Sequence, residues 1–266
     1  MDVLSAPAIA IVARRAQRET QDHRIPLLGV MGAFVFAAQM VNFPVGLGTS
    51  GHLLGGALLA IVLGPGAAVL VMTAILALQA LIFQDGGVLA LGANVFNMAL
   101  AGVVAGYLPY RLWAARSRSA AIFAAGVLSV ITSACLALAQ LLISGVPMRG
   151  GIFWASLALF LVSGLIEGAI TVAAVRAIER LNPAWIPGTE PSASRTAAAV
   201  GIAAVVVLVI GTLIASAAPD GIQRLTAPGL DSASWSQRAL RGIAGLALIS
   251  AVCYLGGKLM SRRRSA

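Results

Sequence analysis

The sequence predicts an all-α integral membrane protein, a polytopic helix bundle with about eight to nine membrane segments. Hydrophobic residues make up 59% of the 266 residues and charged residues only 10%, and the mean hydropathy is +0.95. Such a chain has too little polar surface to cover a water-soluble globule. Its net charge of +9 comes from short basic clusters between apolar runs, a pattern that indicates membrane topology and not nucleic-acid binding.

The first apolar run, residues 3–13, is shorter than the roughly 20 helical residues that cross a hydrocarbon core, and it lacks the features of a signal peptide. It resembles the end of a longer segment. Further apolar runs follow at residues 26–46, 51–63, 67–83, 88–107, 120–145, 152–175, 196–217 and 239–256. The run 51–63 is the doubtful one, because thirteen helical residues reach about 20 Å of a core of about 30 Å. It is either re-entrant or a short, tilted crossing.

The basic residues favour the crossing. If every run crosses, one face receives fourteen of the eighteen basic residues, namely Arg14, Arg15, Arg18, Arg24, Arg111, Arg116, Arg118, Arg176, Arg180, Arg195, Lys258, Arg262, Arg263 and Arg264. Without that crossing, the loops 14–24 and 111–118 would lie on opposite faces and the asymmetry would be lost. The positive-inside rule therefore predicts a cytoplasmic C-terminus and an external N-terminus, with His52 toward the external side. The expected location of this multi-pass chain is the cell (inner) membrane.

One domain boundary is predicted, within a proline-rich cytoplasmic linker at residues 176–195. Residues 1–190 form the main bundle, and residues 191–266 form a two-span hairpin around an external loop at residues 218–238. Cys135 and Cys253 each lie inside an apolar run without CxxC spacing, so we interpret them as packing residues.

The stretch Asn42–Gly56, NFPVGLGTSGHLLGG, contains His52, which is the only histidine within the apolar bulk. Its glycines permit irregular backbone at membrane depth, which makes an ion site plausible. The alternative is a capping or interfacial histidine at a helix start, with Ser50 as the N-cap.

Other polar side chains near or within apolar runs could orient an imidazole ligand, although hydrogen bonding between helices explains such residues equally well. These candidates are Gln39, Asn42, Thr49, Ser50, Asn94 and Asn97. Asn94 and Asn97 are three residues apart and would share one helical face. One histidine cannot hold a transition metal by itself.

Glu167 is the only acidic residue within a predicted span. A proton or cation relay would need a partner for it, and the other predicted spans hold no basic residue except Arg241, at the start of the run 239–256. The alternative is a packed or protonated glutamate that faces a polar interior. Walker A, GxSxG and HExxH motifs are absent, and a catalytic pair is not found, so the sequence does not predict an enzyme.

Two segments, GTSGHLLGG at residues 48–56 and DGGVLALGANVFNM at residues 85–98, resemble the CbiM/NikM family, the substrate-binding membrane components of energy-coupling-factor (ECF) cobalt and nickel transporters. The resemblance covers residues 24–190. Pro219, Asp220 and Gly221 are similar to the start of a PDGLE-type, NikN-like hairpin, although Ile222 and Gln223 replace its Leu-Glu pair.

The resemblance implies a buried site for Co(II) or Ni(II), formed by the N-terminal amine, by a histidine that follows the initiator methionine, and by a later histidine that matches His52. Nitrogen donors of this kind suit Ni(II). This chain begins Met1-Asp2, so the first two sets of ligands are absent from it. We expect that the chain as given starts at an internal codon and lacks the native metal-binding N-terminus. The alternative is a diverged or inactive member that keeps only His52. Metal binding by the chain as written should be weak.

The resemblance also implies that the protein transports Co(II) or Ni(II) without a permanently bound cofactor. Its expected partners are a membrane coupling subunit and a cytoplasmic ATPase pair, within the lipid bilayer and without nucleic acid. The alternative function is a stand-alone channel or secondary carrier for a small cation. Such a protein should carry ionisable residues in several spans, and Glu167 alone argues against it.

Overall fold

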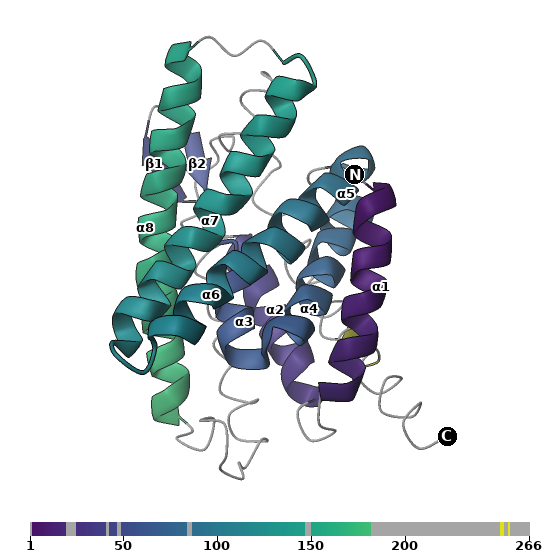
Figure 1. The fold of residues 1–266 in the computed structure, drawn as a ribbon, viewed down its shortest axis with the longest axis vertical. Helices are drawn as coiled ribbons and strands as arrows, with labels where there is room; N and C mark the ends of the chain where they lie inside the picture. The colour runs from purple at the N-terminus through teal and green to yellow at the C-terminus, as the bar shows by residue number, and fades with distance from the viewer. Residues whose placement is uncertain are drawn as a thin grey trace, which may run out of the picture.

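The structure is a computed structural model, and it describes residues 2–19, 25–40, 43–46, 49–83, 87–146 and 150–181, together with residues 251, 252 and 255. The described residues form a bundle of helices with one small β-hairpin (Figure 1). Nearly all of the hairpin domain predicted at residues 191–266 lies outside the described residues.

The helices follow the apolar runs of the sequence. In chain order they are α1 (Asp2–Glu19), α2 (Ile25–Gln39), α3 (Gly56–Leu63), α4 (Pro65–Leu78), α5 (Leu91–Asn94), α6 (Val103–Trp113), α7 (Arg118–Ile143) and α8 (Gly150–Leu181). A π-helical segment, η2 (Gln79–Phe83), continues α4, while a 3-10 turn, η3 (Val88–Ala90), and a second π-helical segment, η4 (Val95–Gly102), flank α5.

Four of the described helical stretches are long and apolar enough to cross a membrane: Pro65–Ile82, Val88–Trp113, Arg118–Ile143 and Gly150–Arg180. They coincide with four of the predicted runs, at 67–83, 88–107, 120–145 and 152–175. Shorter apolar helices cover Ser5–Arg14 and Ile25–Gln39. The helical class is thus confirmed for the described part of the chain, while the total of eight to nine segments stays a prediction.

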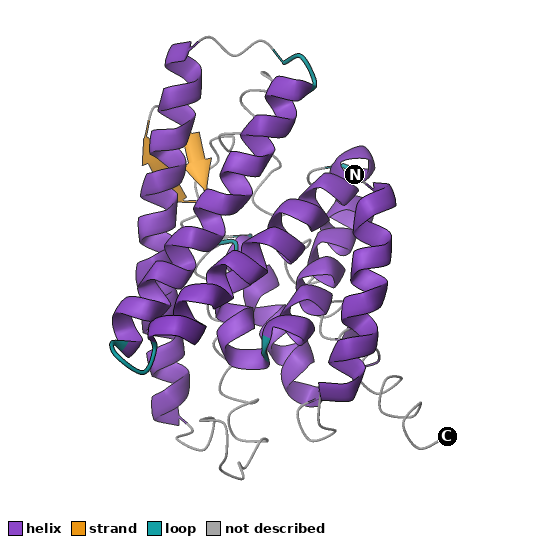
Figure 2. Cartoon of the chain, viewed as in Figure 1, coloured by secondary structure: helices purple, strands orange, loops and turns teal. Residues whose placement is uncertain are grey.

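A two-stranded antiparallel hairpin is the one departure from the all-α prediction. Strands β1 (Phe43–Gly46) and β2 (Thr49–Gly51) pair Phe43 with Gly51 and Pro44 with Ser50, and the register shifts between Pro44 and Gly46 (Figure 2). This stretch is apolar but a poor helix former, because proline lacks an N–H donor and glycine loses much backbone freedom in a helix. The predicted run 26–46 is therefore longer than α2, because its bounds were drawn from hydropathy alone.

The doubtful run at residues 51–63 contains an even shorter helix than expected. The eight residues of α3 span about 12 Å. The helix ends at Gly64, whose φ of 87° lies in the left-handed region, and Pro65 then begins α4. If the chain crosses the membrane here, the residues on either side of α3 must cover the remaining thickness of the hydrocarbon core.

Helix α3 lies at the centre of the bundle, where it contacts α2, α4, α6, α7 and α8. Its Leu58 and Leu59 are fully buried, as are Phe36 of α2, Met72 of α4 and Ile122 of α7. Dense packing around a short helix fixes the position of the segment that leads into it.

Helices α7 and α8 run side by side (Figure 1). They approach closely at a pair of glycines. A Cβ added to Gly126 would lie 2.7 Å from the Cα of Gly168. Small residues at a crossing allow two helix backbones to come together. This contact fixes the part of α8 that carries the neighbouring residue, Glu167.

Candidate functional site

The segment His52–Gly55 connects β2 to the start of α3 and belongs to neither a helix nor a strand. Its backbone polar groups are held by side chains from two other helices. We call this segment the His52 loop. His52 is half-buried, and Leu53 is only 3% exposed.

Glu167 of α8 accepts two hydrogen bonds from the backbone of the His52 loop. The N–H of Leu54 donates to Oε2 at 2.8 Å, and the N–H of Gly55 donates to Oε1 at 2.8 Å. Gly55 is the N-cap of α3, so the carboxyl group lies at the positive end of that helix. The arrangement explains how a glutamate with 1% exposure is accommodated within an apolar span.

Gln39, the last residue of α2, donates a hydrogen bond to a backbone carbonyl group of the same loop. Its Nε2 donates to the carbonyl oxygen of Leu54 at 2.7 Å, and it also lies 3.7 Å from Sδ of Met72. Gln79 in turn donates from Nε2 to Oε1 of Gln39 at 2.8 Å. Leu54 is therefore fixed through both of its backbone polar groups, by Glu167 and by Gln39.

The imidazole of His52 has its Nδ1 3.1 Å from the carbonyl oxygen of Leu53. A carbonyl oxygen only accepts, so this contact assigns the proton to Nδ1 and leaves the lone pair of a neutral imidazole on Nε2. That nitrogen is then a possible metal ligand.

The His52 loop lies at the depth of the membrane-spanning helices. Glu167 is 17 positions after Gly150 and 12 before Glu179 on α8, which corresponds to about 26 Å and about 18 Å along the helix. Irregular backbone at such a depth is tolerated where it is buried in protein and its polar groups are satisfied. The hydrogen bonds from Gln39 and to Glu167 supply that satisfaction.

The other candidates from the sequence are not all brought to this loop. Asn97 of η4 forms two reciprocal amide hydrogen bonds of 2.8 Å with Gln140 of α7, and its carbonyl oxygen accepts from Ser133 at 2.9 Å. Asn94 is the last residue of α5 and is half-buried. Thr49 and Ser50 belong to β2, of which only the backbone is described, and Asn42 lies outside the described residues.

Two polar residues that support these contacts, Gln79 and Gln140, were not candidates from the sequence, and Glu167 was considered there without its contact to the His52 loop. Each is a polar residue within an apolar run, which is the signal that could have identified it. The partner of Glu167 could not have been found by a search for basic residues, because its partners are backbone N–H groups.

Within the described residues, no group of three or more His, Cys, Asp and Glu side chains comes together as a metal site. His23 lies outside the described residues.

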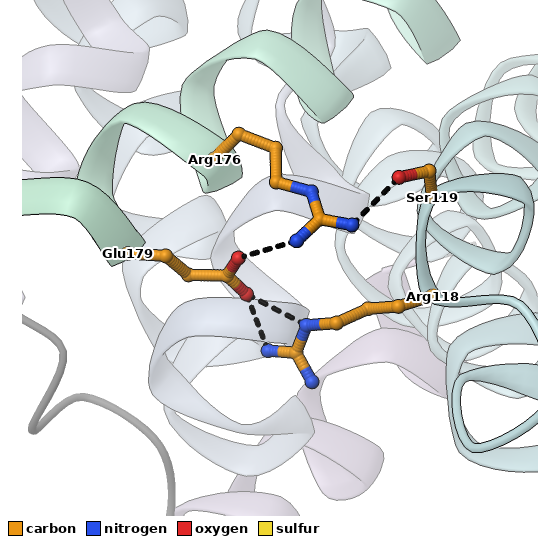
Figure 3. Close-up of polar contacts among 4 residues, drawn as sticks. All are labelled: Arg118, Ser119, Arg176 and Glu179. Carbon is orange, nitrogen blue, oxygen red and sulfur yellow. Dashed lines mark hydrogen bonds and ion pairs between the residues drawn. The ribbon is translucent and has the colours of Figure 1, made fainter.

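A second polar cluster lies where the start of α7 meets the end of α8 (Figure 3). Arg118 donates from Nε to Glu179 Oε1 at 2.7 Å, and Arg176 lies 3.2 Å from Glu179 Oε2 and donates to Ser119 Oγ at 2.7 Å. The guanidinium of Arg118 also lies 5.4 Å from the ring centre of Tyr110. This cluster joins two helices at a distance from the His52 loop.

Apolar helices of spanning length and a histidine loop held by buried polar side chains define a multi-pass membrane protein with a small polar site in its interior. The chain belongs to the CbiM family, described as the cobalt uptake substrate-specific transmembrane region, whose model matches residues 1–185. The resemblance stated from residues 24–190 is thereby confirmed.

Two relatives and one solved structure illustrate the family. A candidate fused nickel transport protein, NikMN, of Archaeoglobus fulgidus is 40% identical over 66% of this chain and 60% of its own length, so this chain spans less than two thirds of that protein. The cobalt transport protein CbiM of Sorangium cellulosum is 34% identical over 68% of this chain and 86% of its own. A crystal structure of a transition metal transporter aligns with a TM-score of 0.54 and 31% identity, over 67% of this chain and 86% of that one.

Proposed function

We propose that this protein is the substrate-specific membrane component of an ECF-type cobalt or nickel uptake transporter. It captures Co(II) or Ni(II) from the external side for import driven by ATP. The observation that carries the proposal is the position of His52 on an irregular loop, at the depth of the spanning helices, whose backbone is held by Glu167 and Gln39. The family and the cobalt and nickel transport relatives support the choice of cargo.

The chemistry of His52 suits this cargo. A neutral imidazole nitrogen is a good ligand for Co(II) and Ni(II), whereas carboxylate, carbonyl and water oxygens favour Mg(II) and Ca(II). Nε2 of His52 is available for this role when the proton resides on Nδ1. Because His52 supplies a single donor, further nitrogen donors or water molecules complete the coordination of the ion.

Energy for import comes from other chains in this proposal. A coupling membrane subunit and a pair of cytoplasmic ATPases act with this protein, which binds the ion but does not hydrolyse ATP. The positive-inside rule supports a cytoplasmic position for the basic residues at the junction of α7 and α8. The opposite ends of these helices, and the N-terminus, then lie on the external side.

Metal accumulation in cells tests the proposal. A bacterial strain without its own cobalt and nickel uptake would produce this chain alone, or together with the coupling subunit and ATPase pair of an ECF transporter. Cell-associated metal would be measured after exposure to low concentrations of either ion. We expect accumulation only when all the subunits are present, and a loss of it in His52→Ala. Accumulation by the chain alone would instead indicate a channel or secondary carrier.

A further inference from the structure

The carboxyl group of Glu167 is buried inside a membrane-spanning helix, and an ion pair to it is not found among the described residues. Both of its oxygens are used by consecutive backbone N–H groups at the start of α3. Buried carboxyl groups within a membrane span are unfavourable unless they are satisfied, and they mark functional sites more often than packing sites. The family assignment gives this residue no role.

We propose that Glu167 is a positioning residue for the metal cargo, which acts by holding the His52 loop in the conformation that presents the imidazole of His52. This inference rests on the proposed function. The carboxyl group does not bind the ion in this account, and its effect passes through the two N–H groups of Leu54 and Gly55.

The contacts around Leu54 carry the argument. Its N–H is held by Glu167 on α8 and its carbonyl oxygen by Gln39 on α2, so the peptide groups on both sides of the residue are fixed by helices that are far apart in sequence. His52 is two residues before Leu54, and among the described residues its ring hydrogen-bonds to the carbonyl oxygen of Leu53. The orientation of the imidazole therefore depends on the backbone that Glu167 holds.

The loop backbone that donates these hydrogen bonds to Glu167 has little conformational freedom. Gly55 has a φ of 75°, and the position of a Cβ there would be only 2.4 Å from Cγ1 of Val35. A loop confined in this way transmits the loss of a hydrogen bond to its neighbours instead of relaxing locally. Groups that orient a metal-binding histidine typically contribute roughly 10- to 100-fold to metal affinity.

Glu167→Gln tests the proposal in the full-length chain, because the amide keeps the size of the side chain but replaces one acceptor oxygen with a donor NH2 group. We expect the dissociation constants for Co(II) and Ni(II), measured by equilibrium dialysis, to rise roughly 10- to 100-fold. Hydrogen exchange of the peptide that contains Leu54 and Gly55 should become faster. Glu179→Gln is the matched control on the same helix and should change neither measurement.

A double variant separates positioning from a general structural role. In a His52→Ala background, the further substitution Glu167→Gln should leave the remaining metal affinity unchanged, because the group that Glu167 positions is no longer there. The same loss of affinity in both backgrounds would overturn the inference. If Glu167→Gln does not yield folded protein, Gln39→Met, which releases the carbonyl oxygen of Leu54, carries the same test with the same expectation.

The outcomes also distinguish this inference from the proposed function. Unchanged metal affinity in Glu167→Gln, with a clear loss in His52→Ala, would overturn the positioning role and leave the transport proposal standing. An intact chain that binds neither Co(II) nor Ni(II) would overturn both.

Discussion

At the scale of single residues, Gly55 shows why the His52 loop tolerates few substitutions. Its φ of 75° is a conformation that residues with a Cβ rarely adopt. The nearest neighbour of an added Cβ would be Val35, a fully buried β-branched side chain with little freedom to move. Both the conformation and the space therefore require glycine at this position.

The substitution Gly55→Ala should lower the thermal unfolding midpoint of the purified protein, with a loss of stability of about 2–5 kcal/mol from backbone strain and overpacking together. Gly64→Ala is the matched control, because Gly64 also has a positive φ but no atom within 4 Å of an added Cβ. It should lose only the strain, about 1–3 kcal/mol. Equal losses in both variants would show that Val35 does not confine the loop.

At the scale of helices and strands, hydrogen bonds between elements connect polar residues whose pairing could not be predicted from the sequence. The amide pair of Asn97 and Gln140 joins η4 to α7 through two hydrogen bonds. Asn97→Leu should destabilise the protein by about 1–2 kcal/mol, because it leaves the amide of Gln140 without its partner. The double variant Asn97→Leu/Gln140→Leu should recover part of that loss in thermal unfolding, and a double variant less stable than the sum of the single ones would contradict the pairing.

The polar cluster at the junction of α7 and α8 is expected to contribute less. Arg118 and Glu179 retain 34% and 20% of their side-chain exposure, so solvent and salt screen their attraction. Glu179→Gln should lower stability by no more than about 1 kcal/mol at low salt. The difference from the unsubstituted protein should shrink as the salt concentration rises, and a large effect that is independent of salt would argue for a role in packing.

Apolar length and helix propensity predicted most of the elements but not their interruptions. The long runs near α4, α6, α7 and α8 were found because a spanning helix needs about 20 apolar residues in succession. The hairpin of β1 and β2 was not predicted, because its glycines and proline weaken a helix without specifying what replaces it. The partners of Glu167 were missed for a different reason, since any residue except proline can supply a backbone N–H.

At the scale of the whole molecule, the distribution of basic residues predicts the orientation in the membrane. Helix α7 joins the basic loop near Arg116 to the opposite face at Ser144. In a chain with Cys135 and Cys253 replaced by serine, Ser144→Cys should react with a membrane-impermeant thiol reagent in intact cells. Ser117→Cys should react only after the membrane is permeabilised, since the positive-inside rule places it in the cytoplasm. Labelling of Ser117→Cys in intact cells, and of Ser144→Cys only after permeabilisation, would show that the orientation is opposite to the predicted one.

The membrane class followed from the composition, and the family followed from two segments of which one includes His52, whereas the environment of that histidine could not be predicted. Gln39 was a candidate because it lies just before the histidine stretch, and the structure places its amide on the carbonyl oxygen of Leu54. Asn97 was a candidate because it is a polar residue within an apolar run, but its side chain pairs with Gln140. Which polar groups meet across a bundle depends on the packing of helices distant in sequence, and a single sequence does not contain that information.

The most direct test of the central claim is the equilibrium binding of Co(II) and Ni(II) to the purified full-length protein and to His52→Ala. The account predicts specific binding that is competed by the other of the two ions but not by excess Mg(II) or Ca(II), because an imidazole nitrogen favours the transition metals. Removal of the imidazole should raise both dissociation constants at least about tenfold. Equal affinities for the two proteins would contradict the claim that the His52 loop is the site of metal capture.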